Sequence, residues 1–441
     1  QGGEISSGQA FTLNARSLDN NAGKLLSNHT LTLHIERALA NLKGQIAAAA
    51  LSVQAGSLDN SEGVLTSRSN LKLISRGSLL NRNNGLINAA TVLDIHSAAL
   101  DNQSGQLLGN RAVRLDLNGG TLNNSAGLIN GEGPLTFNCI GAVDNRNGEI
   151  SSNQGYTLAS AQLDNRAGKI ISSGQLSVVS GAIINSNGLL SGWQGVNLQG
   201  SSLDNRDNGT VSSRSGNLTV NLSGALLNSN VGALVSGGRL DIDSASLDNS
   251  QGGILSSSAG QSLSVHDSLD NSQGGLIDSG AELTVHATDL SNRAGIVNSQ
   301  QTLSLTGKEL DNTGGQLASN GNITLELLGT LINAQRKLAS SRPPRIQHAP
   351  NIDNHDGQMV RHNLRSLFAS SLDNPNPRPL ALLDQLTLNA SGSEQSHPDS
   401  LIYSQNGVVS LSADALENSG GVVRSQTGLT LQISGAINNG L

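Results

Sequence analysis

The residues that could do chemistry in this chain are few and scattered. Three histidines, His348, His355 and His362, follow one another at intervals of seven residues, which raises the question of a metal site. Seven residues is not a spacing that brings two ligands together within one strand or across one helical turn, and no cysteine or glutamate accompanies them. The sequence therefore predicts neither a metal site nor a bound cofactor.

Two carboxylates, Asp241 and Asp243, alternate in the way that places both side chains on one face of a strand. Enzymes that cleave polysaccharides need such a pair, or a carboxylate with a base. No cluster of arginine or histidine surrounds this pair, and no second acidic pair lies one repeat away. We interpret both residues as surface acids and predict no catalytic residue; a β-helical enzyme acting on polysaccharide is the alternative hypothesis.

Composition narrows the classes of function further. The 441 residues carry a net charge of −7 and only 1% aromatic residues, which argues against a basic, aromatic surface for nucleic acid, so no nucleic-acid partner is expected. The single cysteine, Cys139, allows no intrachain disulfide, and we expect it to be a small buried residue. No apolar run approaches the roughly 18 residues of a membrane-spanning helix.

Two short motifs recur once per repeat of about 21 residues. The first is an apolar residue, a variable residue that is often Asp, and then Asn, as in Leu163-Asp164-Asn165. The second is an apolar, polar, apolar triplet, as at residues 176–178, which is the alternation of a half-buried strand. A further apolar segment follows the glycine after each Asn. Each repeat therefore predicts two or three short strands joined by tight turns.

These repeats predict an all-β fold, a right-handed parallel β-helix (β-solenoid) of about 21 coils of about 21 residues each. A helical solenoid is disfavoured because Gly, Ser, Asn and Thr dominate and no 3.6-residue apolar spacing persists. Asn tolerates the left-handed turn conformation, and its amide can donate to and accept from the Asn of the neighbouring coils. The predicted structural Asn ladder includes Asn20, Asn60, Asn102, Asn145, Asn165, Asn205, Asn249, Asn271 and Asn312.

The pattern divides the chain into regular β-helix repeats over residues 1–333, an irregular Pro-rich, basic interruption that decorates the solenoid over 334–400, and resumed repeats over 401–441. Seven of the eight prolines lie in the interruption. The strand triplet is missing near residues 344 and 365, and the Asn mark is missing near 395. Residues 358–368 could form a short helix, because their apolar side chains fall on or near one helical face.

Any recognition of a partner is expected at this interruption, because loops on a rigid scaffold commonly carry recognition. A loop that only tolerates insertion is the alternative interpretation. The candidate partner-binding residues are the basic residues of this stretch: Arg336, Lys337, Arg342, Arg345, Arg361, Arg365 and Arg378.

The repeats Leu-Asp-Asn-x-x-Gly-x-Ile-x-Ser followed by Leu-Thr-Leu, as at residues 163–178 and 269–285, resemble the haemagglutinin repeats of filamentous haemagglutinin-like exoproteins. The resemblance covers about residues 1–333 and 401–441. It implies a non-enzymatic stalk, secreted to the outer surface of a Gram-negative bacterium through an outer-membrane two-partner secretion transporter. Such exoproteins are virulence-associated adhesins, or effectors of contact-dependent growth inhibition that carry a toxin. The implied partners are that transporter and a receptor, protein or glycan, on a host or neighbouring cell.

Overall fold

The computed structural model describes residues 2–335, 337–340, 345–354, 358–360, 367–374, 380–382, 386–390, 393–396, 401–404 and 407–440. Its regular structure is entirely β-strand, arranged as a parallel β-solenoid of about 19 turns, slightly fewer than the 21 predicted. The chain divides into two compact units, Gln1–Ser223 and Gly224–Leu441. Within the described part of the chain, no helix is long and apolar enough to cross a membrane.

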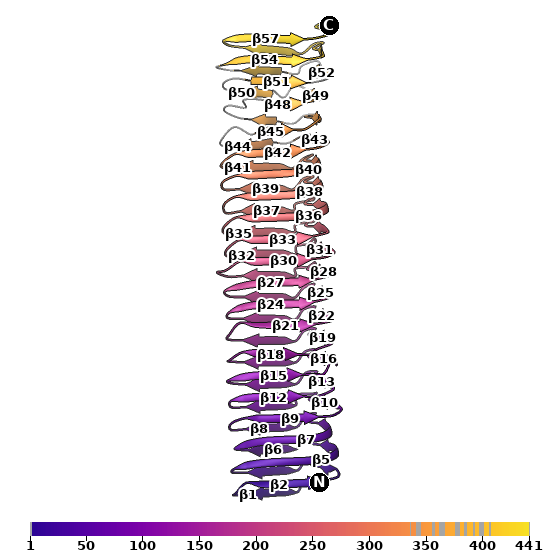
Figure 1. Cartoon of the computed structure of the whole chain (residues 1–441), viewed down its shortest axis with the longest axis vertical. Coiled ribbons are helices and arrows are strands. Elements are labelled where there is room, and N and C mark those ends of the chain that lie inside the picture. The colour runs from indigo at the N-terminus through magenta and orange to yellow at the C-terminus, as the bar shows by residue number, and fades with distance from the viewer. Residues whose placement is uncertain are drawn as a thin grey trace. The chain divides into compact units, whose positions relative to one another are not determined.

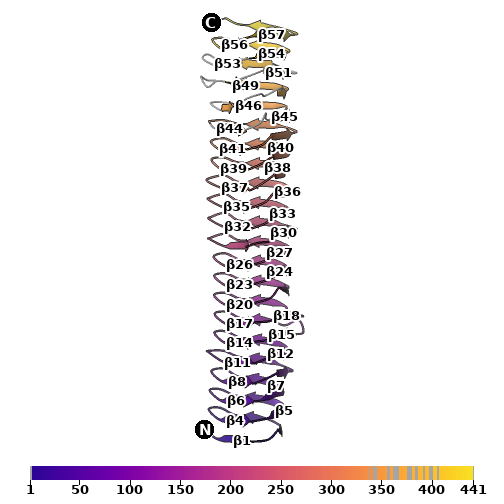
Figure 2. The same cartoon turned by 90° about the vertical axis from the view of Figure 1, so that its left-hand side faces the viewer.

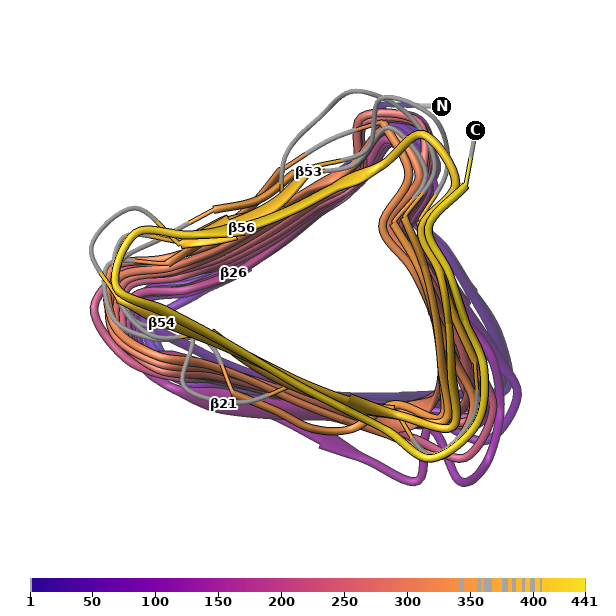
Figure 3. The same cartoon turned by 90° about the horizontal axis from the view of Figure 1, so that it is seen from above.

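A turn of the first unit shows how one repeat folds. Strand β23 (Lys169–Ser172) is followed by a corner, then β24 (Gln175–Ser180), then β25 (Ala182–Ile184), and the Asn185 turn leads into the next repeat. Figure 3 looks along the solenoid and shows β26 (Leu189–Gly192), which pairs with β23, and β21 (Tyr156–Ser160), which pairs with β24, on two different sides of the turn. The three strands correspond to the three apolar segments that the sequence predicts in each repeat.

Equivalent strands of successive turns pair in parallel, one above the next (Figures 1 and 2). β23 lies between β20 (Glu149–Ser152) and β26 (Leu189–Gly192), with Ile170 aligned to Ile150 and Leu190. These three side chains have 0% exposure. Like residues therefore stack in apolar columns, and each fully buried Ile or Leu stabilises the fold by about 1.5–3 kcal/mol.

Strands of the first kind, like β23, begin directly after the turn that follows the Asn. In the first unit the others are β1 (Glu4–Ser7), β4 (Lys24–Ser27), β6 (Gln45–Ala48), β8 (Val64–Ser67), β11 (Leu86–Ala89), β14 (Gln106–Gly109), β17 (Leu128–Gly131), β20, β26 and β29 (Thr210–Ser213). In the second unit they are β32 (Ala233–Ser236), β35 (Ile254–Ser257), β37 (Leu276–Ser279), β39 (Ile296–Ser299), β41 (Gln316–Ser319), β44 (Lys337–Ser340), β47 (Gln358–Val360), β50 (Leu380–Leu382), β53 (Leu401–Ser404) and β56 (Val422–Ser425).

Strands of the second kind occupy the position of the apolar triplet, and all of them except β45 and β48 contain it. Besides β24 they are β2 (Phe11–Ala15), β9 (Leu71–Ser75), β12 (Val92–His96), β15 (Ala112–Asp116), β18 (Leu135–Asn138), β21 (Tyr156–Ser160), β27 (Gly195–Gly200), β30 (Leu218–Leu222), β33 (Leu240–Ser244), β42 (Ile323–Leu327), β45 (Arg345–His348), β48 (Leu367–Ala369), β51 (Leu386–Ala390), β54 (Val408–Ala413) and β57 (Gly428–Ile433).

Strands of the third kind end just before the Asn turn or include its Asn. Besides β25 they are β3 (Leu18–Asp19), β10 (Ser78–Leu80), β13 (Ala99–Asp101), β16 (Leu122–Asn123), β19 (Ala142–Asp144), β22 (Gln162–Asp164), β28 (Ser202–Asp204), β31 (Ala225–Leu227), β34 (Ser246–Asp248), β43 (Thr330–Ile332), β46 (Asn351–Asp353), β49 (Ser371–Asn374), β52 (Ser393–Ser396), β55 (Ala415–Glu417) and β58 (Ile437–Asn438). In five turns the second and third strands are continuous, as β5 (Thr30–Ala40), β7 (Ala50–Asp59), β36 (Gln261–Asp270), β38 (Leu283–Ser291) and β40 (Leu303–Asp311).

The asparagines form hydrogen-bonded columns inside each unit. The Asn145 Nδ2 donates to Asn165 Oδ1 at 2.7 Å, and Asn165 Nδ2 donates in turn to Asn185 Oδ1 at 2.7 Å. The same link joins successive turns from Asn20 to Asn205 in the first unit and from Asn228 to Asn354 in the second. All nine asparagines of the predicted ladder stand in these two columns.

Most of these asparagines also hydrogen-bond within their own turn. The Asn165 Nδ2 donates to Gly168 O, three residues on, and to Leu189 O in the next turn, both at 3.2 Å. A Cβ on Gly168 would lie 2.1 Å from Asn145 O, so only glycine fits under the preceding turn. The Asn itself is not left-handed, contrary to expectation. The left-handed residue lies two positions after the Asn, with φ of 53° at Ala167 and 54° at Lys43.

Two local predictions are wrong. Cys139 is exposed and left-handed, with φ 48°, because it lies in the turn after β18 and Ile140 takes the buried position instead. The short helix predicted at 358–368 begins and ends in strands, β47 and β48; residues 361–366 lie outside the described part. Strand edges of neighbouring turns present unpaired donors and acceptors, and pairing with them overrides a weak helical pattern.

Strands also continue where the sequence marks are missing. β45 and β48 occupy the positions near 344 and 365 that lack the triplet, and β52 spans the position near 395 that lacks the Asn. β52 pairs with β49, so that Ser396 aligns with Asn374. The backbone pairing therefore tolerates sequence that departs from the repeat, and the boundaries at 334 and 400 stay a prediction.

Removing one amide from the column should destabilise the first unit. Asn165→Ala leaves Asn145 Nδ2 with one acceptor fewer and Asn185 Oδ1 without its donor, both in positions closed to water. We expect a loss of about 3 kcal/mol in the free energy of unfolding, measured by urea denaturation with amide hydrogen exchange of the flanking turns. The matched control is Asn187→Ala, since Asn187 is exposed and other turns carry Ala there, as at Ala167. Equal losses in the two variants would contradict the role given to the column.

Candidate functional site

The predicted partner-binding residues lie mainly outside the described part of the chain. This is the case for Arg336, Arg342, Arg361, Arg365 and Arg378. Lys337 begins β44 and Arg345 begins β45. β44 pairs with β41, and β45 pairs with β42 with a register shift after Leu325. The backbone therefore places these two residues on strands of the solenoid, while a binding role for the basic stretch stays a prediction.

The other residues considered for chemistry do not come together. Asp241 Oδ1 accepts from Arg239 at 3.4 Å, whereas Asp243 Oδ1 lies 2.9 Å from His266 Nε2. His348 ends β45, and His355 and His362 lie outside the described residues. Within the described ranges, no three His, Cys, Asp or Glu side chains are close enough together to hold a metal ion. Each of the two carboxylates is thus held by its own basic partner.

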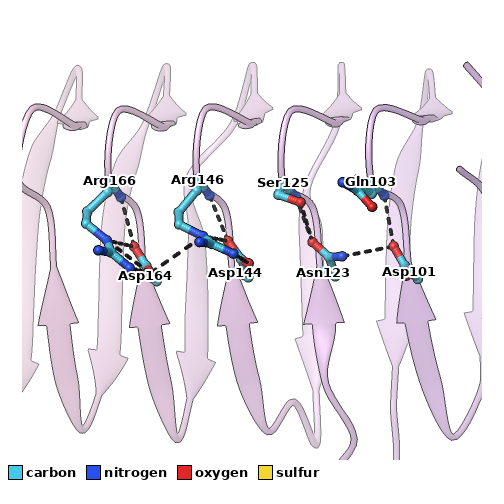
Figure 4. Close-up of polar contacts among 8 residues, drawn as sticks. All are labelled: Asp101, Gln103, Asn123, Ser125, Asp144, Arg146, Asp164 and Arg166. Carbon is cyan, nitrogen blue, oxygen red and sulfur yellow. Dashed lines mark hydrogen bonds and ion pairs between the residues drawn. The ribbon is translucent and has the colours of Figure 1, made fainter. Parts of the chain in front are cut away.

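A denser polar cluster lies on the outside of the first unit, beside the Asn column. The residue before each ladder Asn points outward, and in successive turns these residues are Asp101, Asn123, Asp144 and Asp164 (Figure 4). Their side chains stack because the parallel register aligns β13, β16, β19 and β22. We call this set, with its arginine partners, the Asp–Arg column.

The two central carboxylates are each bound by the arginine that follows the ladder Asn. Asp144 Oδ1 accepts from the backbone N of Arg146 at 3.1 Å and from its Nε at 2.9 Å, and Arg146 Nη2 lies 2.5 Å from Oδ2. Arg166 binds Asp164 in the same way. Arg146 Nε also lies 3.8 Å from Asp164, so the pairs are linked across turns (Figure 4).

The column continues towards the amino end with one more carboxylate, Asp101, and with the neutral residue Asn123. Asp101 Oδ1 accepts from the backbone N of Gln103 and from Asn123 Nδ2 at 3.0 Å, and Asp101 Oδ2 accepts from Arg82 Nε at 2.7 Å. Asn123 Oδ1 accepts in turn from Ser125 Oγ at 2.7 Å. Planar acceptors and donors therefore repeat on this face once per turn.

The arginines keep the carboxylates charged. The hydrogen bond from Arg146, opposed in part by burial, lowers the pKa of Asp144 below its ordinary value, and Arg206 lowers the pKa of Asp204 in the same way. The carboxylates in turn raise the pKa values of Arg146 and Arg166. A carboxyl group with a lowered pKa is a poor general acid near neutral pH. The arrangement is suited to accepting hydrogen bonds rather than to transferring protons.

An open groove of about 320 Å³ runs beside the column. Its lining includes the outward residues Asn123, Asp144 and Asp164 and their buried neighbours Leu122, Val143 and Leu163. The other lining residues are Thr121, Ala142, Gln162, Ala182 and Ile184. The groove thus combines apolar residues with one row of polar ones, which suits a ligand held by hydrogen bonds.

Sequence reasoning missed the Asp–Arg column, although its signal is present. Arg follows the ladder Asn at Arg146, Arg166 and Arg206, and Asp precedes it in the same repeats. Two residues that flank an Asn could point in any direction in an unknown turn. Only the observed turn, in which the backbone folds back on the carboxylate, brings the two side chains together.

The family model described as Haemagglutinin repeat matches residues 1–35, 28–83, 74–146, 119–192, 181–228, 213–272, 258–326 and 384–441. The overlapping matches cover most of the chain and confirm the resemblance drawn from the repeats. All seven basic residues of the predicted partner-binding set lie in the unmatched residues 327–383. No curated protein and no solved structure matches the chain.

Removing the Arg146 guanidinium should raise the pKa of Asp144 towards its ordinary value. The lowered pKa means that the charged carboxylate stabilises the fold above the ordinary pKa, and that this contribution is lost as the pH falls through the lowered value. In Arg146→Gln this pH-dependent loss of stability occurs at higher pH and is smaller. The measurement is an NMR titration of the Asp144 carboxyl carbon.

The matched control for this titration is Arg206→Gln, which removes the equivalent partner of Asp204 in another turn. It should raise the pKa of Asp204 and leave that of Asp144 unchanged. An Asp144 titration that is the same in Arg146→Gln and in the unmodified chain would show that Arg146 does not hold this carboxylate.

Proposed function

The chain belongs to the haemagglutinin repeat family, and from this premise we propose that it is the stalk of a secreted bacterial exoprotein that presents receptor-binding or toxin regions to other cells. The family is one of structural and adhesive proteins, and an adhesin-like extended stalk accords with the β-solenoid fold. The observation that carries the proposal is the repetition itself. Turn after turn buries the same apolar and amide side chains, which leaves the outward positions free to vary.

The physical properties of the solenoid suit a scaffold. Each turn contacts its neighbours through backbone ladders and the Asn column, so stability accumulates turn by turn. Side chains on the outside are then held by a rigid frame, which is how loops and surface residues of scaffold proteins come to carry recognition. We propose that the basic stretch at residues 336–378 is one such recognition region.

Membership of the family also supports a proposal for how the protein is exported and where it is displayed. We propose export through an outer-membrane two-partner secretion transporter and display on the outer surface of a Gram-negative bacterium. The absence of intrachain disulfides, which follows from the single cysteine, is compatible with passage of an unfolded chain through such a transporter. Adhesion to host cells and delivery of a growth-inhibiting toxin to neighbouring bacteria are the two forms that this display could take.

Deleting residues 336–378 should leave the solenoid folded and reduce binding of the chain to target cells by at least about tenfold. The reason is that Asn333 and Asn374 lie two turns apart, so the deletion removes close to two whole turns and the flanking strands can pair. Folding is measured by circular dichroism and thermal unfolding, and binding by flow cytometry with epithelial cells and with Gram-negative bacteria.

The matched control lacks residues 42–81, which are two ordinary turns between Asn41 and Asn81, and should bind like the full chain. Unchanged binding after deletion of 336–378 would refute the recognition role of that stretch. Binding of the full chain to neither cell type would argue against the adhesive function, and release of reducing sugar from polysaccharides would favour the enzymatic alternative.

A further inference from the structure

The single tryptophan of the chain, Trp193, is exposed on the first unit. It lies in the corner between β26 and β27, and 52% of its surface is accessible. Burying an indole is strongly favourable, and only 1% of the residues of this chain are aromatic. An exposed indole lacks that stabilisation, and tryptophan is enriched among the residues that contribute most to binding at interfaces.

The backbone of this corner is fixed by both neighbouring turns. The Trp193 N donates to Ser172 O at 2.9 Å, and the Gln194 N donates to Gly174 O at 3.0 Å. From the other side, Ser215 donates to Trp193 O through its N at 2.9 Å and through its Oγ at 2.8 Å. The indole is therefore carried by a rigid support rather than by a free loop.

The sequence of this corner differs from those of the two adjacent turns. They place a buried serine, Ser172 and Ser213, at the position that Gly192 occupies here. The hydroxyls of these serines hydrogen-bond within their own corners. A Cβ on Gly192 would lie 2.1 Å from Gly195 O, and two other turns also have glycine at this position, Gly109 and Gly131. The residue that distinguishes the corner is therefore Trp193.

One face of the indole is already covered. The guanidinium carbon of Arg214, in the next turn, lies 4.7 Å from the ring centroid in a cation–π contact. In the preceding turn the corresponding position holds the small residue Ser173. The contact with arginine favours one orientation of the ring, and half of the surface of Trp193 stays exposed to a ligand.

Exposed polar residues lie in the same three turns as the indole. Gln175, Gln194 and Asn217 are all exposed. The register aligns Gln175 with Gly195, the second residue after Trp193, and a Cβ on Gly195 would lie 3.8 Å from Gln175 Cγ. Amide side chains therefore belong to the same corner as the indole.

We propose that the Trp193 corner is a glycan-binding site that receives the pyranose ring of a cell-surface sugar. A pyranose has an apolar C–H face, which packs on an indole, and hydroxyls around its edge, which hydrogen-bond to amides and to guanidinium. A protein partner would instead favour further apolar surface around the indole. The exposed neighbours here are polar: Ser173, Gln175, Gln194, Arg214, Ser215 and Asn217.

The inference rests on the proposed adhesive function and names the class of ligand for one surface of the stalk. It is independent of the basic stretch at 336–378, which lies in the second unit. The net charge of −7 also argues against nucleic acid as the ligand of this corner.

The experiment uses the whole chain on a glycan array, followed by titration of the glycan that binds best. Since Trp193 is the only tryptophan, its fluorescence reports this corner alone. We expect a saturable change in emission on binding, and we expect Trp193→Ala to weaken the affinity at least about tenfold without changing the unfolding curve. The control is Leu328→Ala, which removes another exposed apolar side chain, 77% accessible, and should bind like the unmodified chain.

Two outcomes would overturn the inference. The first is an array on which no glycan binding depends on Trp193. The second is Trp193-dependent binding to cells that persists after periodate oxidation of their glycans, which would identify a protein receptor instead. In the first case, binding to cells by the Trp193→Ala chain would leave the proposed adhesive function intact. In the second case, binding to a protein receptor would itself be adhesion, so the two proposals fail separately.

Discussion

The hydrogen bond between asparagine amides of successive turns is the constraint on which the rest of the structure depends. A primary amide buried in an apolar core is stable only when its donors and its acceptor are paired. Here the pairing partner of each amide is supplied by the neighbouring turn, so a turn cannot be completed alone. Asn418 shows the consequence: Ser396 stands where the preceding Asn would be, and Asn418 Oδ1 is buried without a hydrogen-bond partner among the described residues.

The column also fixes the positions around it. A glycine follows most of these asparagines because a Cβ there would meet the carbonyl oxygen of the preceding turn, and the chain becomes left-handed just before that glycine; Asn333 is an exception. The residue before the Asn is then forced outward, and the residue after it folds back towards that same side chain. The Asp–Arg column is therefore a by-product of the amide column, since any Asp and Arg at these two positions meet in this geometry.

The fold could be predicted because the sequence motifs that define its strands recur in most turns. Leu163-Asp164-Asn165 and the triplet at 176–178 recur often enough that alternation and period define the strands without long-range reasoning. Features set by a single turn could not be predicted. The left-handed residue is Ala167 and not Asn165, and Cys139 is exposed although apolar residues flank it. Pairing with adjacent turns, which local pattern does not contain, also replaced the expected helix by strands at both of its ends.

In a repeat protein, residues that recur and residues that break the pattern have different explanations. A residue type that recurs in every turn is accounted for by packing, as the buried asparagines and leucines are. A residue that breaks the pattern while the backbone pairing continues needs another reason. Trp193 stands where the adjacent turns have Ser173 and Arg214, and it exposes an indole without interrupting β26 or β27. Departure from the repeat, on a backbone that keeps its register, is thus the more informative signal of recognition.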